Sequence, residues 1–158
     1  MASTAQGVRV DPYRAFNFLI TLADSAGSSG GAAQSTPAGG FSECSGIEMS
    51  MDIEEYKEGG NNATTLRFPT RIKWTNLRLK RGIALADDLW LWHYGFVQGQ
   101  VVRRDGVVTL LDEQKNPVKV WSFTRGLPVK WTGPSLNAIQ NQVAIEELEI
   151  AHEGLKLL

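Results

Sequence analysis

The chain has 158 residues, a length that suits one domain with an ordinary core, whereas two halves would each be marginal. Hydrophobic residues make up 42% of the chain and charged residues 21%, a globular composition that excludes a disordered polymer. The 16 Lys and Arg nearly balance the 17 Asp and Glu, so a net charge of −1 gives no global field to hold nucleic acid or an anionic membrane.

Residues 1–14 are polar and lack the apolar stretch of a secretory signal, and no later segment approaches the ~20 apolar residues of a membrane span. We therefore expect folding to begin in the cytoplasm. The single cysteine, Cys44, has no internal disulfide partner, which fits a reducing compartment. The glycosylation sequon that starts at Asn62 is interpreted as turn residues, because no secretory signal precedes it.

The first predicted element is a half-buried strand over residues 16–22, where apolar side chains recur with period two. In residues 23–40, 14 of 18 side chains are Gly, Ser or Ala, and none is aromatic, Val, Ile or Leu. Such a segment buries too little apolar surface to offset its ordering entropy. We predict a long flexible loop there, and its glycine spacing matches neither common phosphate-binding motif.

The clearest alternation in the chain lies at residues 47–54, where apolar side chains alternate with polar and acidic ones. It predicts a strand with one apolar face and one acidic face. The segment Tyr56–Asn62 follows, and its paired glycines and paired asparagines favour turns and left-handed backbone. We predict a protruding loop at this point.

The segment from residue 67 to residue 81 is basic where its predecessor is acidic. It contains six basic residues and no acidic one: Arg67, Arg71, Lys73, Arg78, Lys80 and Arg81. Its apolar positions change parity between Trp74 and Leu77. Either a β-bulge or a strand buried on both faces at different points gives this pattern, and the sequence does not choose between them.

The next element is an amphipathic helix, expected over roughly Ala84–Val97. It is indicated by apolar residues spaced by four, three and four, which are Leu85, Leu89, Trp92 and Phe96. Strands at 101–111 and 118–123 flank a hairpin turn at 112–117. An irregular connection follows at 127–134, and a final strand is expected at 143–151.

These elements predict a mainly β (α+β) fold, an antiparallel β-barrel or sandwich of about six to seven strands with one flanking α-helix. No internal repeat is visible, so residues 1–158 are treated as a single domain.

Groups that carry chemistry are scarce. There are two histidines and one cysteine, and the HExxH, CxxC and GxSxG motifs are missing. His93 and His152 are interpreted as ordinary structural or surface residues. The five tryptophans fit a core or a subunit interface better than a cofactor platform. We expect no enzyme activity, no catalytic or metal site and no cofactor.

The basic segment supports two interpretations. Interleaved with Trp74, it can track a phosphate backbone, which predicts a monomeric β-barrel binding module for nucleic acid or a small ligand. Alternatively, the five acids of residues 48–58 precede it, so faces of identical subunits can meet through complementary charge, which predicts self-assembly. An enzyme with dispersed catalytic residues is a third and weaker alternative.

Seven short motifs are spread over nearly the whole chain: Asp11–Phe18, Phe41–Gly46, Tyr56–Gly60, Leu79–Gly82, Leu89–Trp92, Lys130–Asn137 and Ala151–Leu155. None is specific by itself. Their order resembles that of the tail-tube (inner tube) proteins of contractile phage tails and phage-tail-like extracellular contractile injection systems. The loop at 23–40 departs from the compact pattern of that family.

The resemblance implies a β-barrel or sandwich subunit, six copies to a ring, and rings stacked head to tail inside a contractile sheath as a conduit for cargo. It also implies sheath, baseplate or spike, and terminator proteins as partners, and assembly in the bacterial cytoplasm.

A contact between successive rings is predicted at the loop Tyr56–Thr65, from its position, composition and charge. The residues expected to make it are Tyr56, Lys57, Glu58, Gly59, Gly60, Asn61 and Asn62. The six basic residues of the following segment are expected to form the complementary face.

Overall fold

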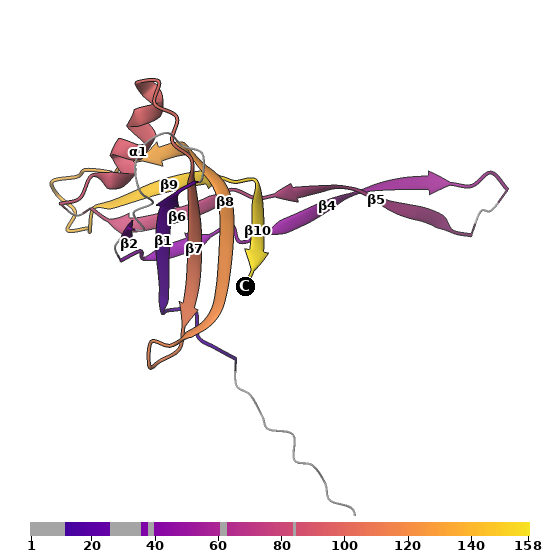
Figure 1. Ribbon diagram of the computed structural model, residues 1–158, viewed down its shortest axis with the longest axis horizontal. Helices are drawn as coiled ribbons and strands as arrows, with labels where there is room; N and C mark the ends of the chain where they lie inside the picture. Colours follow the sequence, from indigo (N-terminus) through magenta and orange to yellow (C-terminus); the bar gives the residue numbers. More distant parts are fainter. Residues whose placement is uncertain (1–11, 26–35, 38–39, 61–62, 84) are drawn as a thin grey trace, which may run out of the picture.

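A computed structural model describes residues 12–25, 36–37, 40–60, 63–83 and 85–158 (Figure 1). Ten strands and one helix are assigned in this part of the chain. In chain order they are β1 (Phe18–Asp24), β2 (Thr36–Pro37), β3 (Glu43–Ser45), β4 (Met49–Lys57), β5 (Thr65–Trp74), β6 (Leu77–Gly82), α1 (Asp88–Val97), β7 (Arg104–Leu111), β8 (Pro117–Thr132), β9 (Ile145–Ala151) and β10 (Gly154–Leu157).

The strands of the body form two layers that share one long strand. All pairings are antiparallel, and the hydrogen-bonded order is β2-β1-β7-β8-β9-β6-β3, with β10 also paired to β8. Strand β8 pairs with β7 up to Gly126 and with β9 from Leu127 onward. In Figure 1, β1, β7 and the first half of β8 stand upright while β6 and β9 run across them. This arrangement is a sandwich whose corner is a strand that changes sheets.

Two bulges flank the corner of β8. Two residues of β8, Thr124 and Arg125, oppose the single residue Asp105 of β7, and Arg125 has a left-handed backbone with φ of 53°. The Asp105 carboxylate accepts a hydrogen bond from the Arg125 backbone N–H at 2.8 Å. Past the corner, Val129 is an extra residue relative to β9. Bulges bend a strand and increase its twist, which is what a change of sheet requires.

The core lies between the two layers. Its buried side chains alternate along the strands and include Leu89 and Trp92 on the inner face of α1. The fully or nearly fully buried set is Ile20, Leu22, Leu77, Leu79, Leu89, Trp92, Val108, Phe123, Leu148 and Ile150. The Phe123 ring packs directly against the backbone of Gly106, since a Cβ added to this glycine would lie 2.1 Å from the ring. The corner therefore depends on glycine in β7 as well as on the bulge in β8.

Strands β4 and β5 leave the body as a two-stranded arm (Figure 1). They continue the β3–β6 pair, from which they are separated by Gly46–Glu48 on one strand and by Thr75 and Asn76 on the other. The residues of both arm strands are exposed, apart from partial burial of Asp52 and Trp74. Among the described residues, no layer packs against the arm.

The predicted fold class is confirmed: the protein is mainly β and antiparallel, sandwich-like, with α1 as the single helix of the described residues. The parity change between Trp74 and Leu77 marks the passage from the arm into the body, so the two residues belong to strands of different sheets. The turn predicted at 112–117 is present, held by Asp112, whose carboxylate accepts the Asn116 backbone N–H at 2.8 Å.

Several predicted boundaries are wrong. The helix starts at Asp88 instead of Ala84, and Leu85 is fully exposed. The connection expected at 127–134 is the second half of β8, which runs to Thr132; Pro128 is tolerated there because a bulge adjoins it. The strand expected from residue 101 begins only at Arg104. Strands β3 and β10 were not predicted, since three or four residues give too little alternation to recognise.

The loop predicted at 23–40 is shorter at both ends. Ala23 and Asp24 belong to β1, and Ser25 is buried, with its backbone N–H donated to the Arg103 carbonyl at 2.9 Å. Residues 36–37 pair with β1 as β2. Residues 26–35 and 38–39 lie outside the described residues.

Replacement of Gly106 by Ala tests the corner. The new methyl group would overlap the buried Phe123 ring, so we expect a loss of about 1–3 kcal/mol in the free energy of unfolding, measured by urea denaturation. Gly154→Ala is the matched control in a strand, because its nearest neighbour, Thr124 Oγ1, would be 3.7 Å away. Equal stabilities for the two variants would contradict this account of the corner.

Candidate functional site

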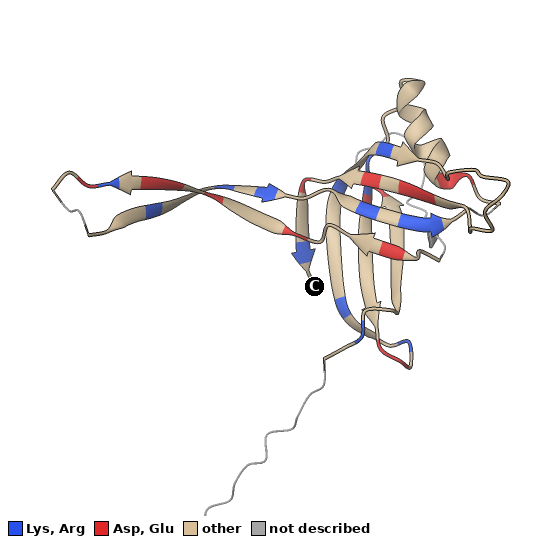
Figure 2. Ribbon diagram, turned by 180° about the vertical axis from the view of Figure 1, so that it is seen from behind, with Lys and Arg blue, Asp and Glu red and all other residues tan. Residues whose placement is uncertain are grey.

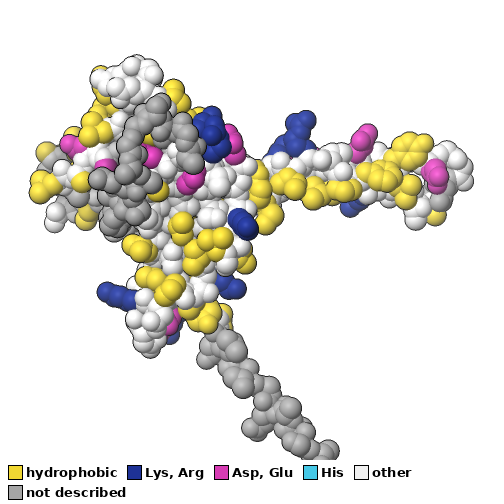
Figure 3. All heavy atoms as spheres, viewed as in Figure 1, with side chains coloured by type: hydrophobic (Ala, Val, Ile, Leu, Met, Phe, Trp, Pro, Cys, Tyr) yellow, Lys and Arg dark blue, Asp and Glu magenta, His cyan; other side chains and the backbone are white. Residues whose placement is uncertain are grey.

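The arm carries seven large hydrophobic side chains that are each at least 42% exposed: Met49, Met51, Ile53, Tyr56, Leu66, Phe68 and Ile72. Near the body, Met49 and Met51 oppose Trp74 and Ile72; near the tip, Tyr56 opposes Leu66 on the other face of the ribbon. Between these groups Thr70 and Arg71 oppose the single residue Asp52, which makes a bulge. Figure 3 shows hydrophobic side chains along the length of the arm. An isolated ribbon of two strands is marginally stable, and an exposed apolar surface of this kind is typical of an interaction site.

The acidic and basic strands predicted from the sequence pair with each other inside one chain. Lys73 Nζ lies 2.8 Å from Asp52 Oδ2, and Arg67 Nη2 lies 3.2 Å from Glu55 Oε1. These pairs join β4 to β5 and are exposed, so each contributes at most about 1 kcal/mol. Figure 2 shows both charges interspersed along the arm.

The three basic residues of β6 also have carboxylate partners within the chain. Arg78, Lys80 and Arg81 contact Glu149, Glu43 and Glu146, at 3.8, 3.1 and 2.6 Å. Among the described residues, no ion pair is found for Arg71. The expected basic face is therefore divided between arm and body, and its contact with another copy stays a prediction.

The predicted contact loop lies at the tip of the arm. Tyr56 and Lys57 are the last residues of β4, while Glu58, Gly59 and Gly60 are exposed and enter the turn, with φ of 99° at Gly60. Asn61 and Asn62 lie outside the described residues. The protrusion is longer than the sequence indicated, since it begins at Met49 instead of Tyr56.

Polar contacts fix the root of the arm. His152 donates Nε2–H to the Thr75 carbonyl at 3.0 Å, and its ring lies between those of Trp74 and Phe123. Asn76 donates to Glu149 at 2.8 Å. Gly46 has φ of 89° and lies so close to Asn76 that a Cβ would be 2.1 Å from its carbonyl oxygen. The arm thus leaves the body at a defined angle.

A second apolar surface covers α1 and the segments beside it. The inner face of the helix is buried through Leu89 and Trp92, yet its outer face is also apolar, with Leu91 62% and Val97 71% exposed. We call this surface the helix-end patch; it comprises Ile83, Leu85, Trp90, Leu91, Tyr94, Val97, Leu136, Ile139 and Val143. A surface helix normally turns a charged face to water, which α1 does not.

A buried ion-pair cluster holds the helix-end patch to the body. Arg81 and Glu146 are opposite each other in β6 and β9, on the inward-facing positions, and both are about 5% exposed. Arg81 also pairs with Asp88 in the first turn of α1, and Glu146 accepts Trp131 Nε1–H at 3.0 Å. Hydrogen bonds and charge from Asp88 and Glu146 overcome the burial of Arg81, so its pKa is raised.

The predicted histidines have structural contacts. His93 donates Nδ1–H to the Pro128 carbonyl at 3.1 Å, which connects α1 to β8. His152 makes the hydrogen bond to the Thr75 carbonyl at the root of the arm. Among the described residues, no three His, Cys, Asp or Glu side chains are grouped to hold a metal ion. In the same part of the chain, no helix is long and apolar enough to span a membrane.

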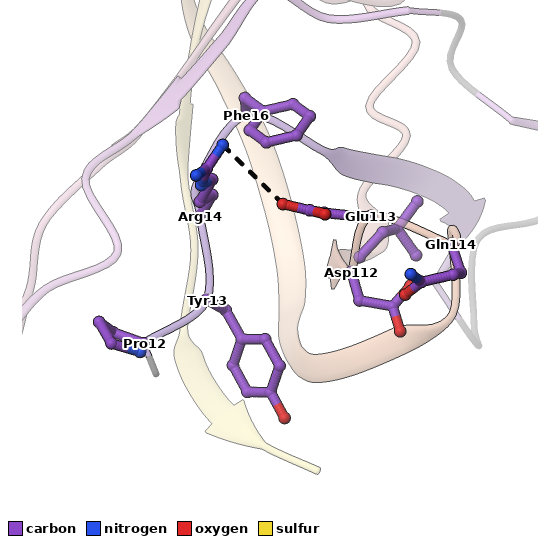
Figure 4. Close-up of a pocket in the computed structure, with 8 residues that line it drawn as sticks. Pro12, Tyr13, Arg14, Phe16, Asp112, Glu113 and Gln114 are labelled. Carbon is purple, nitrogen blue, oxygen red and sulfur yellow. Dashed lines mark ion pairs between the residues drawn. The ribbon is translucent and has the colours of Figure 1, made fainter. Parts of the chain in front are cut away.

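An open hollow of about 350 Å³ lies where the N-terminal segment passes the β7–β8 turn (Figure 4). It is lined in part by Tyr13 and Phe16, and Arg14 pairs across it with Glu113 at 3.9 Å. Both charged side chains are more than 60% exposed, so solvent screens the pair. The lining offers no nucleophile beside a base.

Comparison with known proteins shows which family the chain belongs to. The profile of the family described as T4-like virus tail tube protein gp19 matches residues 14–156. The chain belongs to this tail tube protein family. No curated protein matches the sequence significantly.

Solved structures share the fold of this tube protein. A chain from the anti-feeding prophage baseplate superimposes with a TM-score of 0.84 at 25% identity, covering 95% of this chain and 97% of that one. A chain from the sheath–tube complex of the extracellular contractile injection system PVC gives 0.78 at 21% identity, covering 100% and 99%. A chain from the anti-feeding prophage cap gives 0.79 at 22%, also covering 100% and 99%. The protein is therefore a structural tube subunit.

The buried cluster of the tube protein predicts a large effect of Arg81→Ala. The substitution leaves the buried Glu146 carboxylate without its charge partner, so we expect the free energy of unfolding to fall by about 3–5 kcal/mol in urea denaturation. Lys80→Ala removes a neighbouring but more exposed pair with Glu43 and is expected to cost at most about 1 kcal/mol. A small loss for both would show that the cluster does not hold α1.

Cys44 of the tube protein is predicted to alkylate slowly. Burial, followed by the charge of Glu43, raises the pKa of its thiol to about 11. Only about one thiol in a thousand is then ionised at pH 8, against roughly one in four for an ordinary cysteine. Iodoacetamide labelling followed by mass spectrometry should accelerate tenfold per pH unit up to the pKa, and urea should restore the ordinary rate. Fast labelling of the folded subunit at pH 8 would contradict the raised pKa.

Proposed function

We propose that this tube subunit closes into rings of six and that the rings stack head to tail into the inner tube of a contractile injection system or phage tail. The tube serves as a conduit for cargo, and its subunits assemble in the bacterial cytoplasm. The role is structural, without catalytic turnover, cofactor or metal. A monomeric nucleic-acid-binding module is not favoured, because the basic segment is largely neutralised by carboxylates of the same chain.

The observation that carries the proposal is the uncovered arm. Among the described residues, no layer packs on its seven exposed hydrophobic side chains, so a covering by other copies would stabilise the arm. The arm and the body are different surfaces, so a contact between the arm of one copy and the body of the next is heterologous. Such a contact forms a ring when the rotation from copy to copy closes, and an open helical tube when it does not.

Sheath, baseplate or spike, and terminator proteins are proposed as the other partners. The similar chains come from a baseplate, a sheath–tube complex and a cap, which are the assemblies in which a tube meets such proteins. The outer surface of the ring is the part of this subunit that a sheath reaches.

The tip of the arm is proposed as the contact between successive rings. Glu58, Gly59 and Gly60 are exposed at the far end of the arm from the body, where they can reach a neighbouring ring. The glycines let the backbone fit a partner surface, and the asparagines at 61 and 62 supply donors and acceptors.

Electron microscopy of the purified protein tests both steps. The unaltered chain should form six-membered rings and tubes at moderate concentration. Replacement of residues 57–62 by a two-residue turn should leave rings but stop stacking, because the strands of the arm shaft remain. A matched control shortens the β7–β8 turn at 113–116, which lies away from the arm, and should still give tubes.

Two results would overturn parts of this proposal. A parent protein that stays monomeric at every concentration would remove ring formation. Tubes of normal length from the tip-replaced variant would remove the tip from stacking while leaving the rings in place.

A further inference from the structure

We infer that the helix-end patch is the seat for the arm shaft of the neighbouring copy in the same ring. This inference rests on the proposed ring formation and adds to it the surface that receives the arm. The arm shaft is defined as β4 and β5 without the tip, residues 49–56 and 66–74.

The arm and the helix-end patch occupy opposite ends of the long axis of the molecule. In Figure 1 the arm extends to the right of the body, while α1 and the loop between β8 and β9 lie at the left. A contact between these two ends repeats in one direction from copy to copy, so each subunit gives one arm and receives one. In a closed ring, this single contact covers both surfaces on every subunit.

Neither surface carries a large net charge. From Leu89 to Val102, and again from Gly133 to Ala144, the sequence has no Lys, Arg, Asp or Glu. The arm shaft is nearly neutral as well, because its pairs Asp52–Lys73 and Glu55–Arg67 are satisfied across the ribbon. The two uncharged stretches of the patch can bury the apolar side chains of the ribbon without desolvating an ion of their own, while the carboxylates of Asp87 and Glu146 line the hollow beside them.

Two segments of the patch are joined by a backbone hydrogen bond, and a hollow lies beside them. The backbone N–H of Ile83 is donated to the Ala144 carbonyl at 2.9 Å, which joins the segment before α1 to the β8–β9 loop. Beside this contact lies a hollow of about 500 Å³, whose lining is formed by Ile83, Ala86, Asp87, Trp90, Trp131 and Glu146. The two tryptophan rings meet edge to face, with centroids 4.7 Å apart. A tryptophan-lined hollow within an apolar patch is the usual form of an interface anchor site, and Met51 or Phe68 of an incoming arm has the size to fill it.

Polar groups on the patch match the open edges of the ribbon. Within the residues that the structure describes, the arm strands pair only with each other, so their outer edges present backbone N–H and C=O groups. The indole N–H of Trp90 and the hydroxyl of Tyr94 lie on the patch, and both rings are about 40% exposed. Seated there, the arm receives donors for its outward carbonyl groups.

A mixing experiment tests the inference. The arm variant carries Met51→Arg and Ile72→Arg, and the patch variant carries Leu91→Arg and Ile139→Arg. Each should sediment as a monomer in analytical ultracentrifugation, because one half of every contact is broken. An equal mixture should form a dimer and nothing larger, since the intact arm of the patch variant can seat on the intact patch of the arm variant. Gln114→Arg, at the β7–β8 turn, places one arginine elsewhere on the surface and should assemble like the parent.

The outcomes separate the inference from the proposed function. If the parent forms rings and the patch variant does too, the arm seats elsewhere and the inference is overturned, while ring formation stands. Monomers alone in the mixture of the two variants overturn the inference in the same way. A patch variant that forms rings but no longer binds a sheath would assign the patch to a different protein, which also overturns the inference. A monomeric parent overturns the proposed function itself.

Cross-linking gives a second readout that tolerates an unstable variant. In a Cys44→Ser background, Leu91→Cys is combined in turn with Met49→Cys, Met51→Cys and Phe68→Cys, and assembled protein is treated with a short bismaleimide. At least one pair should give a covalent ladder up to the size of the ring, whereas single-cysteine variants should stop at dimers. Assembled rings without a ladder in any of the three pairs would overturn the inference. Circular dichroism of each variant confirms that it is folded.

Discussion

A ribbon of two antiparallel strands has two faces and two edges, and along the arm the described part of this chain covers none of the four. The body satisfies the same backbone and side-chain demands internally, because its two layers face each other around Phe123, Leu148 and the other core residues. The arm continues the β3–β6 pair beyond that sandwich, where no second layer exists. Its exposed methionine, isoleucine and aromatic side chains form an apolar surface of the kind that another molecule covers in an assembly. The rest of the molecule positions this one incomplete element.

The body is built to hold two surfaces in fixed relation. The arm root is set by His152, Asn76 and the close approach of Gly46, and α1 is set by the ion pairs of Arg81. Both anchors use β9 or the residues after it: Glu146 and Glu149 lie on β9, and His152 directly follows it. Strand β9 therefore connects the two ends of the molecule. If the arm of each copy binds the opposite end of the next copy, such a connection is needed, because an error in the angle between the two surfaces accumulates from copy to copy around a ring.

Sequence patterns predicted the parts of this fold that follow from periodicity. Alternation located β1 and β4, and the helical spacing of Leu89, Trp92 and Phe96 identified the buried face of α1. The order of charged residues showed an acidic strand and a basic strand. It could not show that the two pair within one chain, because strand pairing and register depend on the whole fold. The corner of β8 was missed because Gly126 and Pro128 are ordinary loop signals. Exposure was missed too: the alternation of β4 indicates a half-buried strand, and only the sheet topology shows that nothing covers it.

The continuity of arm and body strands determines how a load on the arm is carried. Strand β5 leads into β6 through two residues, and β6 is paired along its length with β9, which is paired in turn with β8. A pull along the arm axis is therefore directed along β6, and it acts on the β6–β9 hydrogen bonds in shear. Bonds loaded in shear resist together, whereas bonds at a peeled edge break one after another. Since β8 belongs to both layers, the tension spreads across the whole sandwich instead of stopping at one sheet.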